Sequence, residues 1–359
     1  MMQRLGASLP APVRTSVLPE HDAAAGGAKL LSRSPMLMAL GAAGLIGLAG
    51  CGVAPEPPPS ADSGYPLAVS NCGRDVTFDG PPTRIVAHRE MSTLIASAGG
   101  TGRIVARAGE AGVPLGPYAD SLGQVPQIME TDMSAPSREV VLGEQADLVV
   151  AGRVQADYIS TLDQVGVNVL VPPWFCSQVT SDDPEGPAVG FDDLYSTIET
   201  YGRVFDSSEA AARTVSELRR RVTEVEQTAV DSAPRTVVNV WLGRETVTSV
   251  YGALSINDTI MGTLGLTNLF GDLQARNPQV NFEEVLGKDP EMIIVSYLPS
   301  NGYADDAAAI RAFGEISGVQ GMKAVRDGRV VAINSAYLAG GPLSVDGLEM
   351  LADKLSGLS

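Results

Sequence analysis

One long amphipathic segment divides the sequence and limits the folds that the chain can adopt. Over residues 209–229, apolar residues recur at alternating steps of four and three, which places them on one stripe of a helix. The stripe consists of Ala211, Val215, Leu218, Val222, Val225 and Ala229. Ser207 or Ser208 can cap its start, and Pro234 follows its end. At 1.5 Å per residue the helix is about 30 Å long, enough to cross a domain.

Short apolar segments alternate with helical segments on both sides of this helix. Before it, after a hairpin at 67–78, we expect strands at 85–87, 104–106, 148–150 and 167–171 and helices at 91–98 and 154–162. After it, strands at 236–242, 292–295 and 330–333 alternate with helices at 255–264, 282–286, 307–313 and 344–355. This alternation predicts an α/β protein with parallel, doubly wound sheets in two lobes. The lobes are expected at 66–206 and 232–359, with the bridging helix at 207–231.

A lipoprotein export signal precedes the first lobe. Basic residues come before an apolar run at 36–46, and the motif Leu48-Ala49-Gly50-Cys51 follows it. This motif is the bacterial lipobox, in which the cysteine receives a diacylglyceryl group and becomes the first residue after cleavage. A membrane-spanning anchor is the alternative, but it needs roughly 20 apolar residues. We therefore expect 1–50 to be a signal peptide and 51–65, rich in Pro, to tether the protein to the outer face of the cell membrane.

The charge of the chain argues against one class of partner. The whole sequence carries a net charge of −17, and removing the four basic and two acidic residues of 1–50 leaves −19. A surface this acidic repels phosphate backbones, so we expect no nucleic-acid partner.

Two cysteines remain once Cys51 is assigned to lipid. Cys72 and Cys176 form a pair in an oxidising compartment, so we expect a disulfide; two buried thiols are the alternative. No metal site is expected, because His88 is the one histidine after residue 50 and the sequence has no Cys-x-x-Cys motif.

Motifs of common exported enzymes are missing from the sequence. It has no Gly-x-Ser-x-Gly elbow, no His-Glu-x-x-His and no P-loop. The paired carboxylates Asp182-Asp183 and Asp192-Asp193 fall in a polar stretch with Pro and Gly, where we expect solvated loop charges. We therefore predict that the chain is not an enzyme.

Polar and aromatic residues follow the predicted strands. Ligands in open α/β sheets bind beyond the carboxyl ends of the strands. After the first strand come His88, Arg89 and Glu90. The candidate ligand-binding residues are His88, Arg89, Arg107, Arg153, Trp174, Trp241, Arg244, Tyr251, Tyr297 and Tyr337. Arginine suits carboxylate, catecholate or hydroxamate oxygens, and aromatic rings supply flat apolar area, so this set predicts a bulky organic chelate rather than a bare ion.

Several of these residues have other interpretations. Trp241 lies within a strand pattern and fits a core position equally well. Arg107 and Arg244 are alternatively solvated loop charges, and His88 can cap or pack at the strand end.

A series of short motifs occurs in order over residues 66–359. They are Asn71-Cys72-Gly73 with Val76-Thr77-Phe78, Pro81-Pro82-x-Arg84-Ile85-Val86-Ala87, Pro136-Ser137-x-Glu139-x-Val141-Leu142 leading into Ala146-Asp147-Leu148-Val149-Val150, Gly202-Arg203-Val204-Phe205, Phe282-Glu283-Glu284-Val285-Leu286, Asp289-Pro290-Glu291-Met292-Ile293-Ile294-Val295, and Val325-Arg326-Asp327-Gly328-Arg329-Val330-Val331. Together they resemble the iron-siderophore and cobalamin substrate-binding lipoproteins of ABC importers.

The resemblance implies two Rossmann-like lobes joined by one rigid helix, and no cofactor. It also implies that the protein, as a monomer, captures a chelate outside the membrane and delivers it to a permease driven by a cytoplasmic ATPase. By matched position, Glu139 and Glu283 are docking glutamates that pair with permease arginines. Alternatively, each simply begins a helix, where an acidic side chain favours the macrodipole.

The sequence leaves the ligand open within this family. The strand-end arginines favour an anionic ferric-siderophore chelate, whereas the acidic overall charge favours a neutral or cationic hydroxamate. Cobalamin and haem are alternatives, because one fold binds all three. A non-transport surface or regulatory lipoprotein is the alternative from another functional class.

Overall fold

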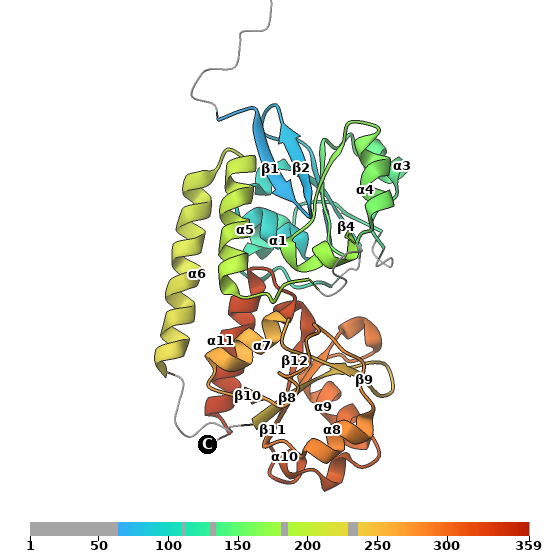
Figure 1. Cartoon of the computed structure of the whole chain (residues 1–359), viewed down its shortest axis with the longest axis vertical. Coiled ribbons are helices and arrows are strands. Elements are labelled where there is room, and N and C mark those ends of the chain that lie inside the picture. Colours follow the sequence, from blue (N-terminus) through green and yellow to red (C-terminus); the bar gives the residue numbers. More distant parts are fainter. Residues whose placement is uncertain (1–63, 110–111, 130–133, 181–185, 229–235, 359) are drawn as a thin grey trace, which may run out of the picture. The chain divides into compact units, whose positions relative to one another are not determined.

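The computed structural model describes residues 64–109, 112–129, 134–180, 186–228 and 236–358. The expected signal peptide, Cys51 and nearly all of the tether therefore lie outside the described residues. Residues from Pro59 to Ser359 form one compact unit, which contains two five-stranded sheets and a small hairpin (Figure 1). In the described ranges, no helix combines the length and the apolar character needed to cross a bilayer.

The first large sheet is parallel throughout and has the strand order β5-β4-β3-β6-β7. All residues of β3 and β6 are buried, as expected for a parallel sheet covered on both faces. The bounds are β3 Ile85–His88, α1 Met91–Ser97, η1 Thr101–Arg103, β4 Ile104–Ala108, η2 Gly116–Tyr118, α2 Ala119–Leu122, β5 Gln127–Ile128, α3 Arg138–Gly143, β6 Leu148–Val150, α4 Ala156–Asp163, β7 Asn168–Leu170 and η3 Pro173–Gln178. Helix α1 packs on β3, and α4 packs on β7.

An antiparallel hairpin, β1 Leu67–Asn71 and β2 Arg74–Phe78, precedes this sheet. Cys72, in its turn, forms a disulfide with Cys176 of η3, with a Cα–Cα distance of 5.0 Å. The expected pairing is thus present. Beside it, the Asn71 side chain exchanges two hydrogen bonds with the backbone of Val171, at 2.7 and 3.0 Å. The hairpin therefore holds the segment that follows β7.

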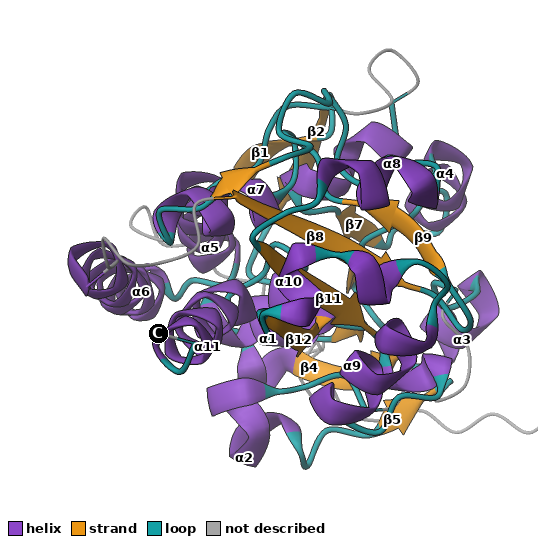
Figure 2. Cartoon of the chain, turned by 90° about the horizontal axis from the view of Figure 1, so that it is seen from below, coloured by secondary structure: helices purple, strands orange, loops and turns teal. Residues whose placement is uncertain are grey.

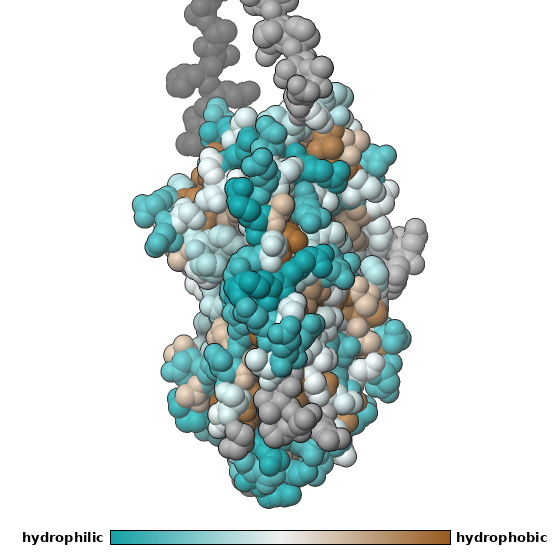
Figure 3. Space-filling model, turned by 90° about the vertical axis from the view of Figure 1, so that its left-hand side faces the viewer, coloured by the Kyte–Doolittle hydropathy of each residue, from teal (hydrophilic) through white to brown (hydrophobic). Residues whose placement is uncertain are grey.

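Helix α6, Ser208–Thr228, is the long helix that the sequence predicts. Its buried residues form the described part of the expected stripe, Ala211, Val215, Leu218, Val222 and Val225, while Ala229 lies outside the described residues. It packs against α5, Phe191–Val204, and lies beside α11 of the second lobe (Figures 1 and 2). The side of the molecule that carries α6 is largely hydrophilic (Figure 3).

Helix α5 was not expected, and the prediction of a loop at Asp192-Asp193 is wrong. Both residues lie in the first turn of α5. The Asp193 carboxylate accepts a hydrogen bond from the Gly190 N–H at 2.8 Å, and Asp192 pairs with Arg219 of α6 at 3.0 Å. Acidic residues are favourable in this position, because the free N–H groups of a helix start carry partial positive charge. Asp182 and Asp183 lie outside the described residues.

The second large sheet has the order β10-β8-β11-β12, and β9 pairs antiparallel with β8. It is therefore mixed rather than fully parallel, because a short turn after β8 returns the chain as β9. The bounds are β8 Thr236–Leu242, β9 Val247–Val250, α7 Ile256–Thr263, β10 Thr267–Asn268, α8 Phe282–Lys288, β11 Met292–Tyr297, η4 Pro299–Asn301, α9 Asp306–Glu315, η5 Val319–Gly321, α10 Lys323–Arg326, β12 Val330–Asn334, η6 Ser335–Leu338 and α11 Leu343–Ser356. The predicted class, two α/β lobes joined by one long helix, is confirmed.

The two faces of this second sheet belong to different cores. Val238 and Val240 of β8 face Phe313 of α9 in one buried cluster. Val237 of the same strand and Ile256 of α7 belong to the other cluster, which continues into the first lobe. The face with α7 is therefore the one that joins the lobes.

Candidate ligand-binding site

The carboxyl ends of β3 and β6 bring two arginines together. His88 ends β3, and Arg89 follows directly, while Arg153 comes three residues after β6. Arg89 and Arg153 both adopt left-handed backbone conformations, with φ of 56° and 58°. Such a conformation costs a non-glycine residue about 1 kcal/mol and is concentrated at functional sites. The Arg89 N–H donates to the carbonyl of Ala108 in β4 at 2.8 Å, which fixes this turn.

Glu90 is a buried carboxylate between these cations. Arg89 Nε lies 3.2 Å from Glu90 Oε2, and the two side chains are only 10% and 9% exposed. Burial acts to raise the pKa of Glu90, but Arg89, Arg153, its own backbone and His88 outweigh burial and hold the pKa below its ordinary value. The carboxyl group is therefore ionised at neutral pH and serves as a counter-ion inside the site.

The position of Arg153 is set by an aromatic ring. Its guanidinium carbon lies 5.1 Å from the centroid of the Phe175 ring, within the range of a cation–π interaction. A Cβ atom at Gly152 would lie 2.4 Å from the same ring, so the close approach of η3 requires glycine there.

Tyr251 faces this cluster from the second lobe. Burial raises the pKa of Tyr251, whereas Arg153 and a hydrogen bond with Ser296 oppose this rise. The positive charge of Arg153 therefore acts electrostatically on the Tyr251 phenol. Tyr251 follows β9 and is half-buried.

A buried network of polar side chains lies beneath Tyr251. Ser296 Oγ donates to Asn239 Oδ1 at 2.7 Å, and Asn239 Nδ2 donates to Asn257 Oδ1 at 2.8 Å. Asn257 Nδ2 donates in turn to the Leu338 carbonyl at 3.2 Å. The network links β8, β11, α7 and η6 on the face that joins the lobes, and a connected buried network of this kind is rigid.

Arg107 is the third arginine of the first lobe that was expected at the site. It lies in β4, beside Ala87 of β3, and is half-buried. Burial lowers its pKa. Its Nε atom is buried and has no hydrogen-bond partner among the described residues.

Trp174 lies between the lobes rather than on an open wall. It is 5% exposed, and its indole packs against Gly340, which follows β12. Its Nε1 atom is buried without a hydrogen-bond partner in the described part of the chain.

The other expected residues of the second lobe are dispersed. Trp241 shares a face of β8 with Asn239 and is half-buried. Tyr297 lies on the opposite face of its sheet, is buried, and donates to Asp306 Oδ1 at 2.8 Å, which favours a packing role. Arg244 is exposed in the β8–β9 turn, and Tyr337 is half-buried in η6. The structure thus brings His88, Arg89, Arg153 and Tyr251 together, while Arg244 and Tyr297 lie elsewhere.

Glu139 and Glu283 are both exposed in the first turn of short helices, α3 and α8. Hydrogen bonds with its own backbone and with Ser137 lower the pKa of Glu139. In α8, the N–H of Glu283 donates to the Asn281 side chain at 3.1 Å. Both positions fit the helix-start interpretation, and the docking role stays a prediction.

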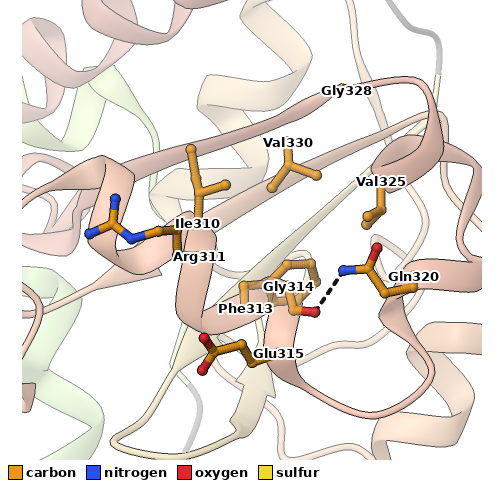
Figure 4. Close-up of a pocket in the computed structure, with 9 residues that line it drawn as sticks. All are labelled: Ile310, Arg311, Phe313, Gly314, Glu315, Gln320, Val325, Gly328 and Val330. Carbon is orange, nitrogen blue, oxygen red and sulfur yellow. Dashed lines mark hydrogen bonds between the residues drawn. The ribbon is translucent and has the colours of Figure 1, made fainter.

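A separate hollow of about 410 Å³ opens on the second lobe (Figure 4). It is lined by Ile310, Arg311, Phe313, Gly314, Glu315, Gln320, Val325, Gly328 and Val330. Val330 begins β12, so this hollow lies at the amino end of that strand, whereas Arg89 and Arg153 follow the carboxyl ends of strands in the first lobe. Gln320 Nε2 is already engaged, donating to the Gly314 carbonyl at 2.7 Å.

Sequence reasoning placed Glu90 after the first strand but missed its role as a counter-ion, and it missed Ser296, Asn239 and Asn257 altogether. The consecutive pair Arg89-Glu90 is a sequence signal from which the counter-ion role of Glu90 could have been inferred. Among the described residues, no group of three or more His, Cys, Asp or Glu side chains is arranged to hold a metal ion.

Comparisons with known proteins agree with this fold. A family model described as periplasmic binding protein matches residues 85–337. The structure of an ABC-type Fe3+-hydroxamate transport system from Saccharomonospora viridis is 30% identical, with a TM-score of 0.67, over 80% of this chain and 98% of that one. A periplasmic heme binding protein from Pseudomonas aeruginosa is 20% identical (TM-score 0.61; 76% and 92% covered). The vitamin B12 binding protein of Vibrio cholerae is 17% identical (TM-score 0.55; 77% and 98% covered). No curated protein matches the chain.

Proposed function

This chain belongs to the periplasmic binding protein family, whose members are extracytoplasmic solute-binding proteins of ABC importers and not enzymes, and from this premise we propose that it captures a ferric-siderophore chelate between its lobes. The bound chelate is then delivered to a permease and its ATPase. Cobalamin and haem are the alternatives within the same fold.

The observation that carries this proposal is the set of arginines at neighbouring strand ends. Arg89 and Arg153 are held in left-handed conformations, and Arg107 lies on the adjacent strand β4. Guanidinium groups offer forked donors to the oxygen atoms of an iron chelate. Tyr251 and Trp241 add half-buried aromatic area from the second lobe, suited to the organic part of the ligand.

The comparisons support an iron chelate over the alternatives. The protein from Saccharomonospora viridis, by its name part of an Fe3+-hydroxamate transport system, is 30% identical to this chain. The heme and vitamin B12 binding proteins are 20% and 17% identical, which supports the fold alone.

The attachment and docking of the protein complete the proposal. Cys51 carries the lipid that tethers the monomer to the outer face of the cell membrane, and residues 51–65 give it reach. Glu139 and Glu283, exposed on α3 and α8, pair with permease arginines and fix the register of docking.

Tryptophan fluorescence tests this function directly, because the chain has two tryptophans and both lie in the region between the lobes. The purified protein is titrated with ferric hydroxamate, ferric catecholate, ferric citrate, cobalamin and haem. We expect saturable quenching at submicromolar concentration by a ferric chelate and none by its iron-free form. A response to cobalamin or haem alone would replace the ligand, and no response to any would favour a non-transport role.

A further inference from the structure

We propose that the buried carboxylate of Glu90 is a specificity determinant, a fixed counter-ion that makes the site prefer iron chelates of little net charge over polyanionic ones. The inference rests on the proposed function and goes beyond it, because it assigns the charge class of the ligand to one residue. A ferric tris-hydroxamate is neutral at its metal centre, since three single charges balance Fe3+. A ferric tris-catecholate carries a charge of −3, because each catecholate contributes two negative charges.

The first step is that Glu90 is directed at the arginines and not at its own helix. Glu90 occupies the N-cap position of α1, where a short polar side chain normally accepts a hydrogen bond from the helix. Its side chain makes no capping hydrogen bond. Instead the carboxylate lies 3.2 Å from Arg89 Nε, and Arg153 and His88 also act on it. A buried charge persists only where it is paired in this way.

A ligand at this site meets charges of both signs. An anion that bound to Arg89 would also meet the negative charge of Glu90, whose Oε2 lies 3.2 Å from Arg89 Nε, and Arg153 acts on the same carboxylate. The arginines can still donate hydrogen bonds to chelate oxygens, but their charge is partly neutralised before the ligand arrives. Recognition therefore depends on hydrogen-bond geometry more than on net charge.

Arg107 is a cation whose charge Glu90 does not neutralise. Arg107 has a buried Nε without a hydrogen-bond partner among the described residues, and burial alone accounts for its lowered pKa. One guanidinium of this kind can meet one partly charged oxygen. It does not match a ligand that brings three negative charges.

Replacing Glu90 by the isosteric, neutral glutamine tests the proposal. Dissociation constants are measured for the ferric complexes of a linear trihydroxamate and of a tricatecholate, by fluorescence and calorimetry, at two salt concentrations. In the wild type we expect the trihydroxamate complex to bind at least about tenfold more tightly. In Glu90→Gln we expect this ratio to move toward the tricatecholate by about tenfold or more, with a steeper salt dependence of tricatecholate binding. Glu199→Gln, an exposed change of the same charge, should leave the ratio within about twofold.

A folded Glu90→Gln protein with an unchanged ratio would overturn the proposal. Should Glu90→Gln fail to fold, Arg89→Gln is compared with the charge-balanced double variant Arg89→Gln/Glu90→Gln. The double variant should bind the tricatecholate complex about tenfold more tightly than the single one. Equal binding by these two would also refute it. A wild type that binds no ferric chelate, ferric citrate included, would refute the proposed function, whereas binding with no effect of Glu90 would refute the inference alone.

Discussion

The indole of Trp174 packs against Gly340, and a Cβ atom at position 340 would lie 3.1 Å from the ring. Trp174 follows β7 of the first lobe, and Gly340 follows β12 of the second. Gly340 also has a φ of 92°, a conformation that side chains rarely adopt. This contact is therefore one of the points at which the two lobes are fitted together.

Gly340→Ala should destabilise the protein by about 2 kcal/mol, because backbone strain and displacement of the ring add. Urea unfolding, followed by tryptophan emission, measures the change. Gly341→Ala is the matched control: no atom lies within 4 Å of its added Cβ, so its effect should stay within about 0.5 kcal/mol. Equal stability of the two variants would contradict the close contact.

Arg221 of α6 joins the bridging helix to α11 of the second lobe. Its guanidinium pairs with Asp346 at 2.5 Å and with Glu349, and its side chain is 18% exposed. Arg221→Met should lower the free energy of unfolding by about 2 kcal/mol, because two carboxylates lose their partner. Arg220→Met, on the exposed side of the same helix, should leave the free energy of unfolding nearly unchanged. An equal decrease in the free energy of unfolding in both variants would mean that the ion pairs between α6 and α11 stabilise the protein no more than exposed ion pairs do.

Periodicity predicted α6 because its buried stripe is long and regular, and the structure confirms it from Ala211 to Val225. The same rule could have found α5, where Phe191, Leu194, Tyr195 and Ile198 are buried, but the polar, Pro-containing stretch before it concealed the start. Element boundaries depend on such local signals.

The site was less accessible to sequence reasoning. Strand ends identified Arg89 and Arg153, because parallel strands place their carboxyl ends together. Glu90 acts as a counter-ion to both arginines only because β3 and β6 are neighbours in the sheet, and this pairing is set by the tertiary structure. Whether Trp241 or Tyr297 faces the other lobe depends on which face of the sheet each strand presents, and composition carries no information on this.

Removing the disulfide should cost stability without changing the fold. Cys72 and Cys176 are 104 residues apart, and closing a loop of that length restricts the unfolded chain by about 4–5 kcal/mol in the chain-entropy model. Cys72→Ala/Cys176→Ala should therefore lower the free energy of unfolding by about 2–5 kcal/mol. The hydrogen bonds between Asn71 and Val171 remain to hold the hairpin, so circular dichroism should stay native. Wild-type protein unfolded in reductant should match the variant; an unchanged urea midpoint would contradict the prediction.

The stability of the protein should depend on pH through Glu90. Burial acts to raise the pKa of this carboxyl, but Arg89 and Arg153 outweigh it, so the folded-state pKa lies below the value of the unfolded chain, about 4.3. Its pairing therefore contributes stability above that pH and loses it as pH falls through the folded-state pKa. At pH 7, Glu90→Gln should lower the free energy of unfolding by about 3 kcal/mol, because the buried Arg89 side chain loses its counter-ion and Arg153 loses a neighbouring negative charge. The gap between variant and wild type should narrow below about pH 4, and a constant gap from pH 7 to 3 would show that the carboxylate is not paired.

The exposed glutamates should affect transport and not binding. In cells or proteoliposomes that carry the permease, Glu139→Ala and Glu283→Ala should each reduce ferric-chelate uptake by about tenfold, since each removes a charged contact that fixes docking. Ligand affinity should stay unchanged, because both residues are exposed at the starts of α3 and α8 and belong to neither strand end that carries Arg89 and Arg153. Glu284→Ala, one residue further along α8 and equally exposed, is the matched control and should transport normally. If Glu139 only supports its helix, its replacement would lower the stability of the protein slightly and leave uptake intact, and that outcome would reject docking at this position.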